Sequence, residues 1–251
     1  MGTRSMVFLD WAMIFHLCKP ENFEILEGFL SELIHRNVKI RHIVKSKRID
    51  NKYSNFNEVE ILAELENREI SVLEMQYGGF ANYFFRERNG ATISFSEYIH
   101  RGDLYKEVNS IYSINITYFD FEAGDDYIYY GSNSLKGLHT NNELCLGRFF
   151  KQLCCKRVTD EYSPQYYIIN PAKIENKVPE NALDEWVFYL YFNKIKDSFT
   201  AKGMDKARQT LLFGALTDEE QSQYHRFLDN LRTYDGVLMT AFNEGRQKAQ
   251  L

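Results

Sequence analysis

The chain has 251 residues, 44% of them hydrophobic and 26% charged, and a formal net charge of −5. This composition is typical of a globular protein, and the length suits one sizeable domain with an appended segment. The acidic balance excludes a protein that coats nucleic acid with its whole surface.

The sequence also indicates a cytoplasmic location. The apolar segment from Val7 to Cys18 is broken by Asp10 and lacks a small-residue cleavage site, so we expect no signal peptide. No apolar run is long enough to span a membrane. The four cysteines have no metal-binding spacing and are expected to be reduced thiols.

Two helices and a strand are expected first. Residues 8–15 are an apolar segment with Asp10 near its start, where an aspartate can also serve as a helix cap. A second helix begins at Pro20 and ends near Asn37. Residues 38–49 then predict a strand of mixed alternation. The buried face of the second helix is predicted from apolar residues at helical spacing, namely Phe23, Leu26, Phe29, Leu30, Leu33 and Ile34.

Residues 36–52 form a basic stretch, with seven Lys or Arg residues against one acidic residue. Such a stretch can follow a phosphate backbone. Lys45, Lys47, Arg48 and Lys52 are therefore candidates for DNA contacts. Lysines that guard a solvated strand edge give the same pattern, so both interpretations stay open.

Residues 56–76 predict a β-hairpin. Two segments in which apolar and polar residues alternate flank a short polar break at residues 66–68. Counting outwards from this loop sets Glu60 opposite Glu74. Because the side-chain period of a strand is two, a slip of one residue in the loop would remove this pairing.

The predicted register sorts the side chains of the hairpin onto two faces. Two carboxylates directly opposite each other repel, so a divalent cation bound through oxygens is a natural partner for Glu60 and Glu74. Carboxylates on the wet side of a half-exposed sheet are the alternative. The face that can sit on a core carries Val59, Ile61, Ala63, Leu65, Leu73 and Met75. The other face carries Leu62, Ile70 and Val72 near the loop and Glu58, Glu60, Glu74 and Gln76 at its far end.

The remaining elements are a mixture of helices and strands. Residues 80–100 predict a long helix. Strands are expected at residues 110–120 and 127–131, separated by a polar turn. From residue 181 the pattern is helical, and Thr217-Asp218-Glu219-Glu220 is a capping box that opens the last helix.

Several of these stretches resemble the PD-(D/E)XK nucleases, and in particular the recombination-promoting nuclease and transposase-related family. Phe56-Asn57-Glu58-Val59-Glu60-Ile61-Leu62 is similar to the first active strand of that family, and Glu74-Met75-Gln76 to the Glu-x-Gln of its second. Their spacing, 74 − 60 = 14 residues, is ordinary for the motif. Tyr83-Phe84-Phe85-Arg86 and the segment from Ser94 to Tyr105 also fit. Residues 8–15 are similar to the helix that opens this family, and the resemblance covers about Asp10 to Asn142.

The resemblance implies metal-dependent hydrolysis of DNA phosphodiesters in a mobile-element or recombination setting. Glu60 and Glu74 would hold Mg²⁺ or Mn²⁺, and the carbonyl of Met75 and Asp10 would complete the protein ligands. Gln76 stands where the wider superfamily has a lysine. An amide cannot act as a base, but it can orient a water by hydrogen bonding.

The implied fold is α/β and restriction-endonuclease-like. A mixed central sheet would contain the active hairpin, with helices on both sides and a helical segment at the C-terminus. Residues 1–150 would form the nuclease-like core, and residues 151–251 a helical extension on or beside it. Arg86 would contact phosphate, although a surface ion pair explains its charge equally well.

Two departures from the family pattern keep other functions open. Glu60 is one methylene longer than the expected aspartate, and Glu58 adds a carboxylate where the family often has arginine. The main alternative is a catalytically inactive nuclease-fold module that binds DNA or protein. A homodimer is compatible with either interpretation. A third interpretation is an interaction protein that uses its aromatic surface and helical tail.

Overall fold

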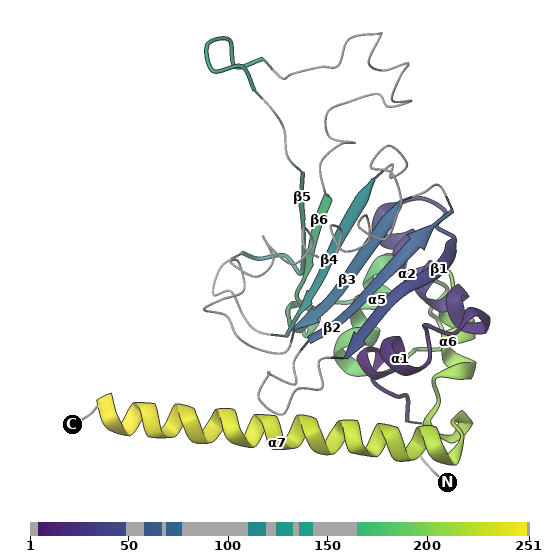
Figure 1. Ribbon diagram of the computed structural model, residues 1–251, viewed down its shortest axis with the longest axis vertical. Coiled ribbons are helices and arrows are strands. Elements are labelled where there is room, and N and C mark those ends of the chain that lie inside the picture. The colour runs from purple at the N-terminus through teal and green to yellow at the C-terminus, as the bar shows by residue number, and fades with distance from the viewer. Residues whose placement is uncertain are drawn as a thin grey trace.

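A six-stranded sheet organises the described part of the chain (Figure 1). The computed structural model describes residues 5–48, 58–66, 69–76, 110–118, 124–132, 136–142 and 165–249. The strands are β1 (Ile40–Arg48), β2 (Glu58–Leu65), β3 (Ile70–Gln76), β4 (Ile111–Thr117), β5 (Ile128–Gly131) and β6 (Gln165–Ile169). The α-helices are α1 (Leu9–Phe15), α2 (Phe23–Ile34), α5 (Ala182–Phe192), α6 (Met204–Thr210) and α7 (Asp218–Ala249), and 3₁₀ turns lie at Pro20–Asn22, Pro171–Ile174 and Phe213–Ala215.

The sheet is mixed, with the order β1-β2-β3-β4-β6-β5. The first three strands are antiparallel, β4 and β6 run parallel to β3, and β5 is antiparallel to β6. The β2–β3 hairpin therefore lies inside the sheet, between β1 and β4. The predicted α/β fold, with a mixed sheet that contains the hairpin and a helical C-terminus, is confirmed.

Both faces of the hairpin are buried near its loop, and the predicted sorting of side chains is confirmed there. Ile61, Ala63 and Leu73 belong to the main core. On the opposite face, Leu62, Ile70 and Val72 form a separate apolar cluster. The alternation of apolar residues thus reflects an inner hairpin that is covered on two sides.

Helices α2 and α5 lie behind the sheet in Figure 1 and share the main core with it. Phe29 of α2 meets Trp186 of α5 edge to face, with ring centroids 6.0 Å apart. Each such fully buried side chain contributes about 1.5–3 kcal/mol of transfer free energy. Helix α2 ends earlier than predicted because His35 takes the left-handed conformation, with φ of 56°, and the N–H of Arg36 bonds back to Ser31.

Gly28 allows the segment before α6 to approach α2 closely. A Cβ at this position would lie 2.0 Å from the carbonyl oxygen of Lys202. A larger residue would therefore push the segment before α6 away from α2. The glycine fixes where the C-terminal part of the chain packs.

The chain beyond residue 150 contributes to the sheet as well as to the helices. We predicted only helices there, yet β6 is an inner strand between β4 and β5. Its Ile169 is fully buried in the main core. The sheet is therefore built from both parts of the chain. The helix predicted at residues 80–100 lies outside the described residues.

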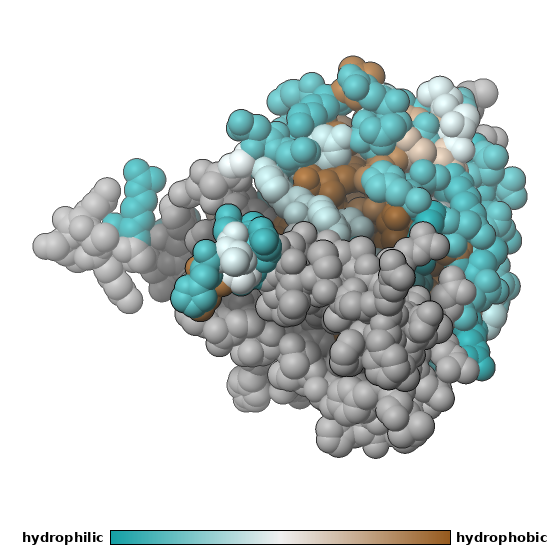
Figure 2. Space-filling model, turned by 90° about the horizontal axis from the view of Figure 1, so that it is seen from above, coloured by the Kyte–Doolittle hydropathy of each residue, from teal (hydrophilic) through white to brown (hydrophobic). Residues whose placement is uncertain are grey.

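Helix α7 runs along one end of the molecule (Figure 1). It is 32 residues long, and Tyr224 and Phe227 in its first half join the main core. The predicted capping box is confirmed, because Thr217 Oγ1 accepts from the N–H of Glu220, and Glu220 Oε2 accepts from the N–H of Thr217. In Figure 2 the described surface is mostly hydrophilic around a central hydrophobic area.

Candidate functional site

The β2–β3 register places two acidic positions opposite each other. Leu65 and Glu69 close the hairpin, with the N–H of Leu65 2.8 Å from the carbonyl oxygen of Glu69. Counting from this pair, Glu60 pairs with Glu74, as predicted. The pairing depends on local sequence alone, because a three-residue break leaves only one register that buries both apolar sets.

The same row continues across the sheet on both sides of this pair. Lys47 of β1 pairs with Glu60, and Asn115 of β4 pairs with Glu74. The next row brings Glu58, Gln76 and Thr117 together. The backbone thus gathers cationic, acidic and amide residues at one end of four adjacent strands.

Several predicted site residues fall outside what the structure describes. At positions 45–48, 58–60 and 74–76 the structure describes the backbone but not the side chains. The roles of Glu60, Glu74, Met75 and Gln76, and the DNA contacts of Lys45, Lys47 and Arg48, stay predictions. Arg86 and Lys52 lie wholly outside the described residues.

The first half of the basic stretch is engaged in ion pairs. The Arg36 guanidinium pairs with Glu69 and donates to Tyr112 Oη at 2.8 Å, which ties the end of α2 to the hairpin loop and to the start of β4. Two further pairs join Lys39 with Glu27 and Arg41 with Glu64. These three cations have structural partners, so the DNA-binding prediction concerns the second half of the stretch.

Strand β4 carries buried polar side chains that our sequence analysis did not select. Ser113, Asn115 and Thr117 are each at most 2% exposed. Asn115 Nδ2 donates to Ser113 Oγ at 3.1 Å, and Thr117 Oγ1 donates to the carbonyl of Ile169 at 3.4 Å. The signal was present in the sequence, because polar residues occupy every second position of β4 between buried isoleucines.

Asp10 lies in the first turn of α1 and is 2% exposed. Its Oδ1 accepts a hydrogen bond from Tyr118 Oη at 2.6 Å, and its Oδ2 has no hydrogen-bond partner among the described residues. Tyr118 directly follows Thr117, so this contact is at the same end of the sheet as Glu74 and Gln76.

The environment of Asp10 favours the protonated carboxyl. Burial raises the pKa of Asp10 to about 7, and the hydrogen bond from Tyr118 offsets only part of this effect. The alternative role as a helix cap is wrong, because Phe8 occupies the N-cap position and no side chain caps α1. The metal-ligand role predicted for Asp10 stays a prediction.

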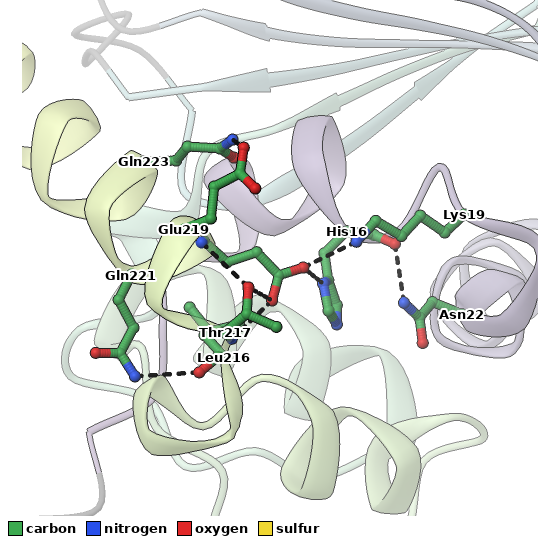
Figure 3. Close-up of polar contacts among 9 residues, drawn as sticks. His16, Lys19, Asn22, Leu216, Thr217, Glu219, Gln221 and Gln223 are labelled. Carbon is green, nitrogen blue, oxygen red and sulfur yellow. Dashed lines mark hydrogen bonds and ion pairs between the residues drawn. The ribbon is translucent and has the colours of Figure 1, made fainter.

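A second polar cluster fastens α7 to the connection between α1 and α2 (Figure 3). Glu220 Oε1 accepts from Lys19 Nζ at 2.8 Å and lies 3.4 Å from His16 Nδ1. Burial alone would raise the pKa of Glu220, but hydrogen bonds from Lys19 and Thr217 outweigh it and lower the pKa to about 2. The cluster is a structural anchor with an ionised centre.

An open cavity of about 590 Å³ lies between the turn before β5 and the start of α5. Its most buried carboxylate, Asp184, already accepts from Tyr127 Oη and from the N–H of Glu180. Lys177 Nζ stands 4.6 Å above the ring of Tyr127. No group of three or more His, Cys, Asp or Glu side chains suited to a metal occurs among the residues that the structure describes.

Comparisons with models of known protein families, with curated proteins and with solved structures found no match to this chain. In the described ranges, no helix combines the length and the apolar character needed to cross a membrane.

Proposed function

We propose that the protein is a metal-dependent endonuclease that hydrolyses DNA phosphodiester bonds. One observation carries the proposal: Glu60 and Glu74 pair directly on two inner strands of the sheet. Opposed carboxylates destabilise a sheet unless a positive group lies between them. The resemblance of these two strands to the PD-(D/E)XK nucleases supports a cation in that position.

The residues at this end of the sheet fit a hard divalent cation. Carboxylate and carbonyl oxygens are the donors that Mg²⁺ and Mn²⁺ prefer, and Glu60, Glu74 and the carbonyl of Met75 supply them. Asp10 is the fourth candidate. Its buried carboxyl would have to lose its proton to bind, which a nearby cation favours.

Different residues would bind the cation, orient the water and contact the phosphate backbone. Bound by the two glutamates, the cation would stabilise negative charge on the phosphate and activate a water. Gln76 would orient the water by hydrogen bonding. Lys47, whose backbone position is next to Glu60, would contact the phosphate backbone together with Lys45 and Arg48.

The test is cleavage of supercoiled plasmid by the purified protein with Mg²⁺ or Mn²⁺. We expect nicked or linear product from the wild type and none from Glu74→Ala or Glu60→Ala. Glu66→Ala is the matched control, because Glu66 belongs to the same hairpin but lies exposed at its loop, so cleavage should continue. Cleavage that persists in Glu74→Ala would show that another site, or a contaminant, is responsible.

The same experiment separates the main alternative, an inactive nuclease-fold module that binds DNA or protein. Such a module would leave the plasmid intact with either cation. It would still retard DNA in a gel if the second half of the basic stretch contacts phosphate. A Lys47→Ala variant should then weaken DNA binding and reduce its dependence on salt.

A further inference from the structure

Asn115 occupies an unusual position for a polar side chain. It is 2% exposed on β4, an inner strand, and its neighbours along the strand, Ile114 and Ile116, belong to the main core. A buried amide is costly unless its hydrogen-bonding groups are used. The parallel register places Asn115 directly beside Glu74.

A second buried side chain holds Asn115 in place. Its Nδ2 donates to Ser113 Oγ at 3.1 Å, and Ser113 is itself 1% exposed. An amide nitrogen carries two hydrogens and an amide oxygen accepts, so Asn115 can bond more than one group at the same time. The bond to a buried hydroxyl also limits the orientations that the amide can take.

A neutral donor is well suited to a site that binds a cation. An N–H that bonds a carboxylate fixes the orientation of the carboxylate and favours its ionised form. An amide does this without adding a positive charge that would repel the cation. Groups that orient metal ligands in this way commonly change metal affinity by about 10- to 100-fold when they are removed.

We propose that Asn115 is a positioning residue that orients the Glu74 carboxylate for binding of the divalent cation, and that Ser113 holds Asn115 in the required orientation. This inference rests on the proposed endonuclease function. It adds a residue of β4 to the metal site, whose ligands on strands the sequence placed only on β2 and β3.

The test measures Mn²⁺ affinity by titration calorimetry together with plasmid cleavage at several Mn²⁺ concentrations. We expect Asn115→Ala to bind Mn²⁺ at least tenfold more weakly and to recover cleavage when Mn²⁺ is raised. Circular dichroism without metal should show that the variant is folded, so that the recovery reports Mn²⁺ affinity and not folding driven by the metal. Ser113→Ala should show a smaller loss in the same direction.

Ser71→Ala is the matched control. Ser71 is also 1% exposed on an inner strand, but it pairs with Ala63 on the opposite face of the hairpin, and its hydroxyl has no partner among the described residues. Its replacement should leave Mn²⁺ affinity unchanged. If Asn115→Ala does not fold, Ser113→Ala decides the test by the same comparison.

The outcomes separate this inference from the proposed function. A wild type that binds Mn²⁺ and cleaves DNA, with both β4 variants equal to it, overturns the role of Asn115 alone. A wild type that neither binds Mn²⁺ nor cleaves DNA overturns the proposed function and this inference with it. Weaker Mn²⁺ binding by the β4 variants, with Ser71→Ala unchanged, supports the inference.

Discussion

Asp10 is the most buried of the aspartates and glutamates whose side chains the structure describes. It is almost fully buried, with one oxygen bonded to Tyr118 and the other without a described partner. A carboxyl in such a place keeps its proton unless a cation is near. Among the described residues, Asp10 is therefore a buried, protonatable group whose one hydrogen-bonding side chain is Tyr118.

The pH dependence of stability tests this environment. Because the pKa of Asp10 is raised to about 7, its contribution to stability is fully present below the unfolded value and is lost as pH rises through about 7. The loss is at most about 4 kcal/mol. We therefore expect Asp10→Asn to gain stability over the wild type between about pH 5 and about pH 8, measured by urea unfolding without divalent cations.

A second variant checks that Asp10 is the source of this pH dependence. Tyr118→Phe removes the donor that lowers the pKa of Asp10, so the wild-type loss of stability with pH should persist or steepen. Parallel pH profiles for the wild type and Asp10→Asn would contradict the buried, protonatable carboxyl.

The hairpin is the element on which the candidate site depends. Its backbone pairs Lys47, Glu60, Glu74 and Asn115 in one row, and its apolar residues are buried on both faces. An inner position with two covered faces holds the strands rigidly. Such rigidity is what a site needs if its ligands come from separate strands.

Burial on both faces predicts the effect of truncating either set of apolar side chains. We expect Ile61→Ala and Leu62→Ala each to cost about 2–5 kcal/mol in the free energy of unfolding, since each leaves a cavity. Val178→Ala is the control at an exposed position and should cost less than about 0.5 kcal/mol. A negligible cost for Leu62→Ala would mean that the second face is not covered in solution.

At the scale of the whole molecule, the sheet depends on residues far apart in the chain. Strand β6 pairs with both β4 and β5, and its Ile169 lies in the main core. Helices α5, α6 and α7 add buried residues to the same core. Residues before and after position 150 therefore share one hydrophobic core.

This shared core predicts the behaviour of a fragment. Residues 1–150 would lack β6 and the helices that follow it, so the fragment should not show a cooperative thermal transition by circular dichroism, whereas the full chain should. The fragment exposes the core face of β4 and leaves this strand without its β6 partner. A sharp transition in the fragment would mean that the two parts fold independently.

The sequence alone determined the features that depend on local periodicity. The alternation of apolar residues around the short loop specified the hairpin register, including the pair of Glu60 and Glu74. Helical spacing gave the buried face of α2, and the capping box gave the start of α7. These features follow from neighbours within a few residues, where the geometry of helix and strand leaves little choice.

Only the tertiary structure decided which distant residues meet. It placed β6 between β4 and β5, set Asn115 beside Glu74, and buried Asp10 against Tyr118. No local pattern specifies such contacts, because they depend on how the helices and strands pack once their own apolar faces are formed. Local sequence therefore specified that Glu60 pairs with Glu74, whereas tertiary packing decided which residues from other strands and helices lie near this pair.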